Sequence, residues 1–250
     1  MFSGTIPQIY TPVKFSVTTV YFIEFPPPNR YAFAMKDTDL DHISTKTRGW
    51  RGSRAIWLAA AREAFVSSGL DAVRIQPLAS RLNLSRTSFY WFFTDRSALL
   101  DALLEDWETS NTGSLISATE AYAETVTEAM LNVIGVFLDD GPFESRLDLA
   151  MRGWAHQDSK VADRVAHADE VRLAAIRALF IRFDYPPSEA DVRARTVYLT
   201  QIGYISLQVS EDLVTRMTRI PDYVKTYTGH RPTEPELARF RARHNIPDPA

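Results

Sequence analysis

The chain has 250 residues, of which 45% are hydrophobic and 24% charged, and its formal net charge is −3. This composition is typical of a soluble globular protein and excludes collagen-like, coiled-coil-only and fully disordered chains. The absence of cysteine excludes disulfides, thiol nucleophiles and cysteine-based zinc sites, and no apolar stretch reaches the roughly 20 residues that a membrane-spanning helix needs.

The charge is unevenly distributed along the chain. Residues 46–100 hold nine basic and three acidic residues, a net charge of +6, whereas residues 1–45 carry −1 and the last 150 residues carry −8. A compact basic segment joined to an acidic remainder indicates two units, of which the basic one faces a polyanion such as nucleic acid. Chance clustering of solvated arginines is the alternative, and charge alone does not decide between them.

The first 46 residues differ from the rest in composition. Five prolines and many β-branched and aromatic residues fall within the first 31 positions, and no helical period is present there. We predict that 1–46 is a disordered or mistranslated extension and that Met35 is the native start. A genuine disordered arm is the alternative, and the intact mass of protein from the native host distinguishes the two.

Helical periodicity begins at Arg54. Apolar residues recurring every three or four positions predict four helices in the first half of the chain, over 54–68, 75–82, 85–91 and from a cap at Thr94 or Asp95 to Trp107. The remainder shows no strand alternation and predicts longer helices near 115–139, 143–156, 160–183, 189–211, 213–228 and 234–244. Gly113 and Pro221 are among the residues expected to break them. The predicted fold class is therefore all-α.

The two short helices at 75–82 and 85–91 are joined by about two residues, the spacing of a helix-turn-helix. Ala79 is small where a second helix must cross closely, and Phe89 and Phe92 give the second helix an apolar back. Its front is predicted to expose hydroxyls, a guanidinium and two aromatic rings that can contact base edges and phosphates: Ser85, Arg86, Thr87, Ser88, Tyr90 and Trp91. An ordinary helical hairpin with a polar face is the alternative reading of the spacing alone.

Residues 54–107, roughly a fifth of the chain, resemble the N-terminal domain of the tetracycline-repressor (TetR) family of transcription regulators. The residues that carry the resemblance are Gly69, Ala79, Ser85, Ser88, Phe89, Tyr90, Phe93 and Arg96. Three positions depart from the family pattern, because Thr87 and Asn83 stand where glycine is usual and Arg96 stands where lysine is usual. These departures leave the operator sequence unpredicted.

The resemblance implies an N-terminal three-helix helix-turn-helix DNA-binding domain at 47–107, followed by a helical ligand-binding and dimerisation domain at 108–250. In the family, residues aligned with Tyr90 and Arg96 contact phosphates, and those aligned with Arg86, Thr87, Ser88 and Trp91 face the groove. A basic arm before the first helix would contact the DNA backbone or the minor groove, and a solvated linker is the alternative; its residues are Lys46, Arg48 and Arg51.

The predicted helix 189–211 is apolar on nearly every side, so it must bury one face against its own domain and another against a partner copy. Gly203 would allow a close helix crossing. Aromatic and polar residues on facing helices are candidates for a ligand site, although core packing is the alternative for each; they are Trp107, Tyr122, Phe137, Met151, Trp154, His156 and Tyr198. We find no motif for catalysis, a metal or a cofactor.

The sequence thus predicts a homodimeric, ligand-responsive repressor that binds a palindromic operator in double-stranded DNA. We expect a bacterial cytoplasmic protein, associated with the nucleoid when bound to DNA, with a small-molecule effector of unknown identity and no membrane partner. Two alternatives stay open. One is a regulator of the same fold without an effector, acting as an activator or with a protein partner. The other is a helical enzyme, for which no catalytic constellation is visible.

Overall fold

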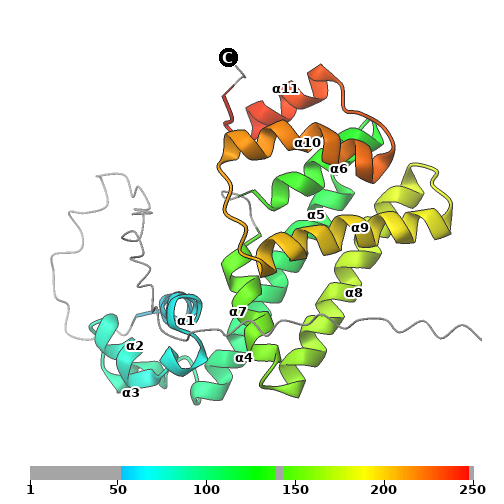
Figure 1. Cartoon of the computed structure of the whole chain (residues 1–250). Coiled ribbons are helices and arrows are strands. Elements are labelled where there is room, and N and C mark those ends of the chain that lie inside the picture. The colour runs from blue at the N-terminus through cyan, green and yellow to red at the C-terminus, as the bar shows by residue number, and fades with distance from the viewer. Residues whose placement is uncertain (1–51, 139–142, 248–250) are drawn as a thin grey trace, which may run out of the picture. The chain divides into compact units, whose positions relative to one another are not determined.

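A computed structural model describes residues 52–138 and 143–247, and every regular element within these ranges is a helix (Figure 1). The predicted all-α fold is therefore confirmed. The predicted extension, its Met35 and the arm residues Lys46, Arg48 and Arg51 lie outside the described ranges. No helix in those ranges is both long and apolar enough to cross a lipid bilayer.

The N-terminal helices follow the predicted boundaries closely. They are α1 (Arg54–Ser68), a single 3-10 turn η2 (Leu70–Ala72), α2 (Ile75–Arg81), α3 (Arg86–Phe89) and α4 (Arg96–Trp107). Three of them begin at side-chain caps, because the side chains of Ser53, Ser85 and Asp95 each accept a hydrogen bond from a backbone N–H of the first turn. Asp95, one of the two predicted caps, is the residue that starts α4.

The prediction of one continuous helix over 115–139 is wrong. The chain continues from α4 through a π-helical segment, η3 (Glu108–Thr112), into α5 (Gly113–Glu120), leaves the helix, and begins again at α6 (Val126–Val136). Gly113 does not break the helix, since its backbone has helical φ −61° and ψ −41°. The true break lies before Thr125, whose side chain caps α6 by accepting from the Glu128 N–H. Apolar residues on both sides of this break mimic one continuous helical stripe.

The remaining helices are α7 (Ser145–Ala155), α8 (Ser159–Arg182), α9 (Pro187–Ser206), α10 (Leu213–Thr228) and α11 (Glu234–Arg243). Helix α9 ends five residues earlier than predicted, and Pro221 lies inside α10 without ending it. Helices α8 and α9 form a hairpin, and α10 and α11 pack on α6 at the opposite end from α2 and α3 (Figure 1).

The apolar core consists of two clusters that α8 connects. One cluster joins the buried faces of α1 to α4 with those of α7 and the first half of α8, including Leu147, Met151 and Trp154 from α7. The other joins α5, α6 and the second half of α8 with α9, α10 and α11. Helices α1 to α4 therefore bury their apolar side chains partly against helices that lie far along the chain.

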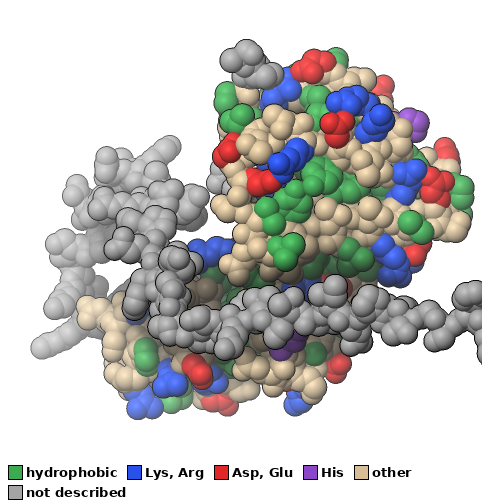
Figure 2. Space-filling model, in the orientation of Figure 1, with side chains coloured by type: hydrophobic (Ala, Val, Ile, Leu, Met, Phe, Trp, Pro, Cys, Tyr) green, Lys and Arg blue, Asp and Glu red, His purple; other side chains and the backbone are tan. Residues whose placement is uncertain are grey.

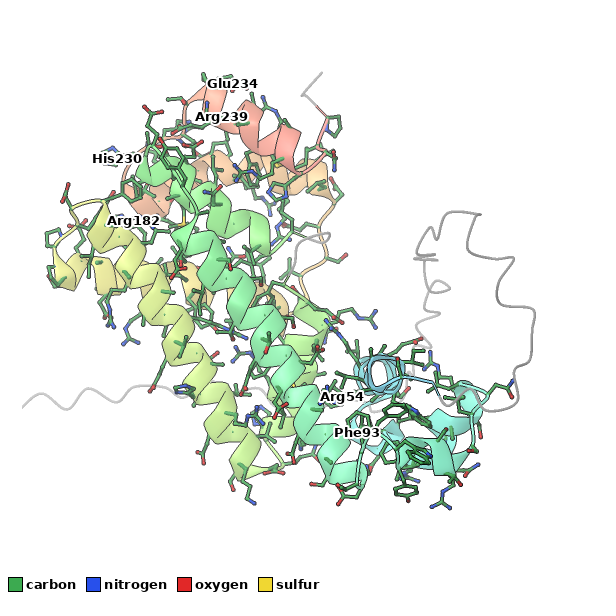
Figure 3. All side chains as sticks on the ribbon, turned by 180° about the vertical axis from the view of Figure 1, so that it is seen from behind. Arg54, Phe93, Arg182, His230, Glu234 and Arg239 are labelled. Carbon is green, nitrogen blue, oxygen red and sulfur yellow. The ribbon has the colours of Figure 1, made fainter. Side chains whose placement is uncertain are left out.

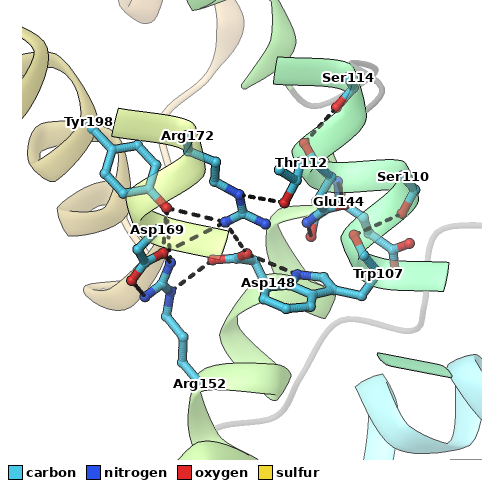
Figure 4. Close-up of polar contacts among 11 residues, drawn as sticks. Trp107, Ser110, Thr112, Ser114, Glu144, Asp148, Arg152, Asp169, Arg172 and Tyr198 are labelled. Carbon is cyan, nitrogen blue, oxygen red and sulfur yellow. Dashed lines mark hydrogen bonds and ion pairs between the residues drawn. The ribbon is translucent and has the colours of Figure 1, made fainter. Parts of the chain in front are cut away.

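A buried network of polar and charged side chains connects five of these segments (Figure 4). Arg172 on α8 is 0% exposed and donates hydrogen bonds to Asp148 on α7 at 2.9 Å, to Thr112 on η3 at 3.0 Å and to Tyr198 on α9 at 3.2 Å. Its guanidinium also lies over the ring of Trp107, 5.0 Å from the centroid. One buried side chain thus contacts α4, η3, α7, α8 and α9 at a single point.

Two further residues extend the network towards the surface. Arg152 donates to both oxygens of Asp169, at 2.7 and 2.9 Å, and the Tyr198 hydroxyl donates to Asp169 at 2.6 Å. Burial alone would raise the pKa of Asp169, but the hydrogen bonds from Arg152 and Tyr198 outweigh it, so the pKa lies below its usual value. Burial raises the pKa of Tyr198. Asp169 is therefore ionised and Tyr198 protonated near neutral pH.

We expect Arg172→Met to lower the free energy of unfolding by about 3 kcal/mol, because the buried Asp148 carboxylate loses one of its two arginine partners and keeps only Arg152, at 2.8 Å. The matched control is Arg195→Met on α9, whose ion pair with Asp191 is exposed and should contribute less than about 1 kcal/mol. Urea unfolding followed by circular dichroism measures both. Equal losses for the two variants would contradict a central role for Arg172.

Candidate nucleic-acid interface

The turn between α2 and α3 has the geometry of a helix-turn-helix. Asn83 takes a left-handed backbone with φ 52°, which asparagine tolerates better than most residues. The N–H of Leu84 then donates to the Ala79 carbonyl at 2.9 Å and closes the turn. Ala79 is buried at this crossing. The burial of Ala79 confirms the prediction of a small residue where the two helices cross closely.

An aromatic cluster holds the short helix α3 in place. Phe89 is fully buried, packs edge-on against Trp57 with centroids 5.3 Å apart, and stacks with Phe93 at 5.4 Å. Arg54 lies over the outer face of Phe93, 5.3 Å from the ring centroid (Figure 3). These contacts fix the back of a helix that is too short to be stable by itself.

The exposed front of α3 contains most of the residues predicted for it. Ser85, Arg86 and Thr87 are exposed, as are Tyr90 (50%) and Trp91 (61%), which lie in the turn after the helix ends. Arg86 forms no ion pair with a residue in the described ranges. Adjacent exposed aromatic side chains are typical of interaction surfaces. This front therefore has the composition of a binding surface.

The prediction that Ser88 is exposed on the front of the helix is wrong. Ser88 is only 4% exposed, and its hydroxyl donates to the Ser85 carbonyl at 2.6 Å, while its N–H donates to the Ser85 hydroxyl at 3.2 Å. Residues three apart lie on the same side of a helix, and both hydrogen bonds of Ser88 return to Ser85. Ser88 therefore takes part in the cap of α3. Its side chain therefore does not belong to the exposed front.

Arg96 has an internal role in this structure. Its Nε donates to the Val73 carbonyl at 2.6 Å and its Nη2 donates to the Leu70 carbonyl at 2.8 Å. These bonds tie the first residue of α4 to the η2 turn that leads into α2. A planar guanidinium bridges two carbonyls in a way that a lysine ammonium does not, which gives the arginine at this position a physical reason.

Arg62 connects this region to the rest of the chain. It donates to Asp106 near the end of α4 at 3.0 Å and pairs with Glu144, which precedes α7. The basic residues of the segment 46–100 are thus divided between two tasks, since Arg62 and Arg96 hold the helices together while Arg86 is exposed to solvent.

The predicted ligand residues do not form one site. Trp107 and Tyr198 belong to the buried network, and Met151 lies in the core. Tyr122 is 87% exposed and His156 is also at the surface. Phe137 and Trp154 line a cavity of about 770 Å³. Within the described ranges, no group of three or more His, Asp or Glu side chains is placed to hold a metal ion.

The other residues of this cavity were not identified from the sequence. They include Phe65 on α1, Gln201 and Tyr204 on α9, and Arg216 on α10. These residues come from three helices, and Phe65 lies more than 130 positions before Gln201 in the chain. No local sequence pattern links these residues, so the cavity can be recognised only in the three-dimensional structure.

Comparisons with known proteins agree with this geometry. Residues 58–103 match the family model described as bacterial regulatory proteins, tetR family, a segment that includes α2, α3 and most of α1 and α4. No curated protein sequence matches the chain. The chain therefore carries a helix-turn-helix DNA-binding domain, and that domain is of the TetR family.

Solved structures show the same fold over most of the chain. A protein from Mesorhizobium loti assigned as a TetR-family transcriptional regulator has 16% identity and a TM-score of 0.53, covering 76% of this chain and 95% of its own. Mycobacterium smegmatis AmtR has 18% identity and a TM-score of 0.52, covering 82% and 99%. Escherichia coli NemR in its reduced form has 14% identity and a TM-score of 0.54, covering 72% and 97%.

We expect Arg96→Ala to lower the free energy of unfolding by about 2 kcal/mol, because two hydrogen bonds from a charged group to backbone carbonyls are lost. Arg86→Ala, which removes an exposed arginine of the same domain, should change it by less than about 0.5 kcal/mol. Thermal and urea unfolding measure both variants. An unchanged stability for Arg96→Ala together with weaker DNA binding would instead assign Arg96 to a phosphate contact.

Proposed function

We propose that this protein is a homodimeric repressor that binds a palindromic DNA operator and responds to a small molecule. The observation that carries the proposal is the exposed front of α3, where Arg86 and Thr87 stand on a helix fixed by buried aromatic rings. Such a rigid back allows short side chains to meet base edges with defined geometry.

DNA recognition is assigned to the residues on this front. Arg86 would make a bidentate contact to guanine O6 and N7 in the major groove, and Thr87 would contact a base or a thymine methyl. Tyr90 and Trp91, half or more exposed, would pack against the sugar-phosphate backbone. Arg96 would contribute indirectly, by holding the η2 turn in front of α2. Lys46, Arg48 and Arg51 remain the proposed basic arm.

We expect selection of the full chain against random duplex DNA at 150 mM salt to enrich a palindromic site. Arg86→Ala should relax the preference at one base pair per half-site, at a cost of about 1–3 kcal/mol against the best site. Arg231→Ala, which removes an exposed arginine between α10 and α11, is the matched control and should leave the preference unchanged. Enrichment of no sequence at all would remove the basis for the proposed operator.

A second surface supports the proposed dimer. One side of α9 is buried, but Val192, Thr196 and Leu199 on the other side are exposed, with Leu199 59% accessible. Figure 2 shows hydrophobic side chains gathered over α9 and α10, and the exposed ones there include Leu207, Val209, Leu213 and Val214. Contiguous exposed apolar side chains of this kind mark protein interfaces.

Gly203 lies on the same side of α9 as Thr196 and Leu199, at helical spacing. A Cβ built at Gly203 meets no atom within 4 Å, so within the described ranges no helix crosses there and the predicted close crossing is not intramolecular. A crossing with α9 of a second copy would use this space. Two-fold symmetry would then place two α3 helices on the two halves of a palindrome.

We expect Leu199→Glu to yield a monomer in light scattering coupled to size exclusion, because a carboxylate buried in the interface would be unpaired. Tyr122→Glu, which adds the same charge at another exposed hydrophobic residue, should leave the dimer intact. The Leu199→Glu monomer should also lose the preference for a palindrome over a single half-site. A wild-type monomer would refute the proposed dimer, and a dimeric Leu199→Glu would place its interface elsewhere.

A further inference from the structure

The cavity of about 770 Å³ lies between helices of the DNA-binding domain and helices of the C-terminal region. Its wall is formed by the end of α1 and the following Gly69 and Leu70, by α7, and by the end of α9 with the start of α10. This volume is within the range of small-molecule sites in proteins. Any molecule bound there would contact both α1 and the C-terminal helices at once.

One side of the cavity is aromatic and apolar. Phe65 and Trp154 pack edge-on with centroids 5.8 Å apart, and Phe137, Leu149 and Ile205 continue the same wall. Phe65 and Trp154 are themselves largely buried, so their ring positions are set by the core. A flat hydrophobic molecule fits such a wall better than a sugar or another strongly hydrated compound does.

The cavity wall also contains an arginine of α10, Arg216. Arg216 is half-buried, lies over the Tyr204 ring at 5.5 Å, and forms no ion pair with a residue in the described ranges. The cavity wall also holds one carboxylate, Glu211, which pairs with Arg219 through Oε1, while its buried Oε2 has no hydrogen-bond partner within the described ranges. The guanidinium of Arg216 is therefore held in place by an aromatic ring and offers its donors to an anionic group.

Gly153 provides a second, independent observation. It lies inside α7 and lines the cavity, yet a Cβ at this position would meet no atom within 4 Å. Glycine inside a helix costs about 1 kcal/mol relative to alanine, and no packing contact with a residue in the described ranges requires it. The missing side chain leaves room on the α7 side of the cavity, as a bound molecule would need.

We propose that this cavity binds an aromatic compound with one anionic group, with its ring on Phe65 and Trp154 and its anion on Arg216. The inference deepens the proposed ligand-responsive function by naming the site and chemical class of the effector, and it rests on that function for its regulatory meaning. Because the cavity wall continues through Leu70 into the turn held by Arg96, occupancy would change the position of α2 and α3.

The test uses two fluorescent probes with the same fused and phenyl rings, 1-anilinonaphthalene-8-sulfonate, which is anionic, and N-phenyl-1-naphthylamine, which is neutral. We expect the full chain to bind the sulfonate more tightly, at one site per protomer. Arg216→Gln should weaken the sulfonate by about tenfold, as for a lost hydrogen bond to a charged group, and the neutral probe by less than about twofold.

Gly153→Leu places a branched apolar side chain in the cavity and should strongly weaken binding of both probes. Gly113→Leu is the matched control, since Gly113 is also helical and also has open space at its Cβ, but it does not line the cavity. Unchanged sulfonate binding by Gly153→Leu would overturn the proposed site. An equal loss of both probes in Arg216→Gln would overturn the proposed anionic class.

Coupling to DNA is measured separately, so the two proposals can fail independently. Saturating sulfonate should change the affinity of the full chain for its selected DNA site by at least about fivefold, and the Gly153→Leu variant should show no such change. If the chain binds the probe but no specific DNA site, the regulatory proposal is refuted and the proposed ligand site stands. Tight DNA binding that ignores the bound probe would overturn its role as an effector site.

Discussion

The rest of the structure depends on the need to satisfy one buried charge, that of Arg172. A guanidinium at zero exposure is costly unless a counter-charge and hydrogen-bond acceptors meet it. Here these groups come from η3, α7 and α9 and bind its Nε and Nη1, while its Nη2 has no hydrogen-bond partner within the described ranges. Apolar packing of helices tolerates small shifts, whereas these bonds require defined distances. The ion pair with Asp148 therefore fixes how α7, α8 and α9 are placed around the end of α4.

From this point, rigidity extends towards the DNA-binding helices by two routes. The first is α4 itself, which runs from the buried network back to Arg96 and the η2 turn. The second is Arg62 on α1, which holds Asp106 and Glu144 together. Since α1 to α4 share their core with α7 and α8, a displacement of α7 would also displace α1. The cavity lies beside this shared core, between α1 and α7.

Much of the fold was predictable because its signals are local. Caps such as Ser85 and Asp95, the left-handed Asn83 and the apolar back formed by Phe89 each depend on a few neighbouring residues. The break before α6 was missed, since apolar residues on either side of it continue a helical period. The burial of Ser88 was missed because its hydroxyl turns back onto the Ser85 carbonyl. The cavity was not predictable in principle, because distant segments build it.

The π-helical segment Glu108–Thr112 has a consequence for how a single helical rod serves two cores. Buried positions before it include Leu100, Leu103 and Trp107, and those after it include Leu115 and Thr119. A wider turn takes up one extra residue, which rotates everything beyond it by about 100° relative to an unbroken α-helix. The π-helical segment therefore sets the rotation of α5 about the helix axis relative to α4. Changes in length, which surface loops usually accept, would here turn the inward face of α5 out towards solvent.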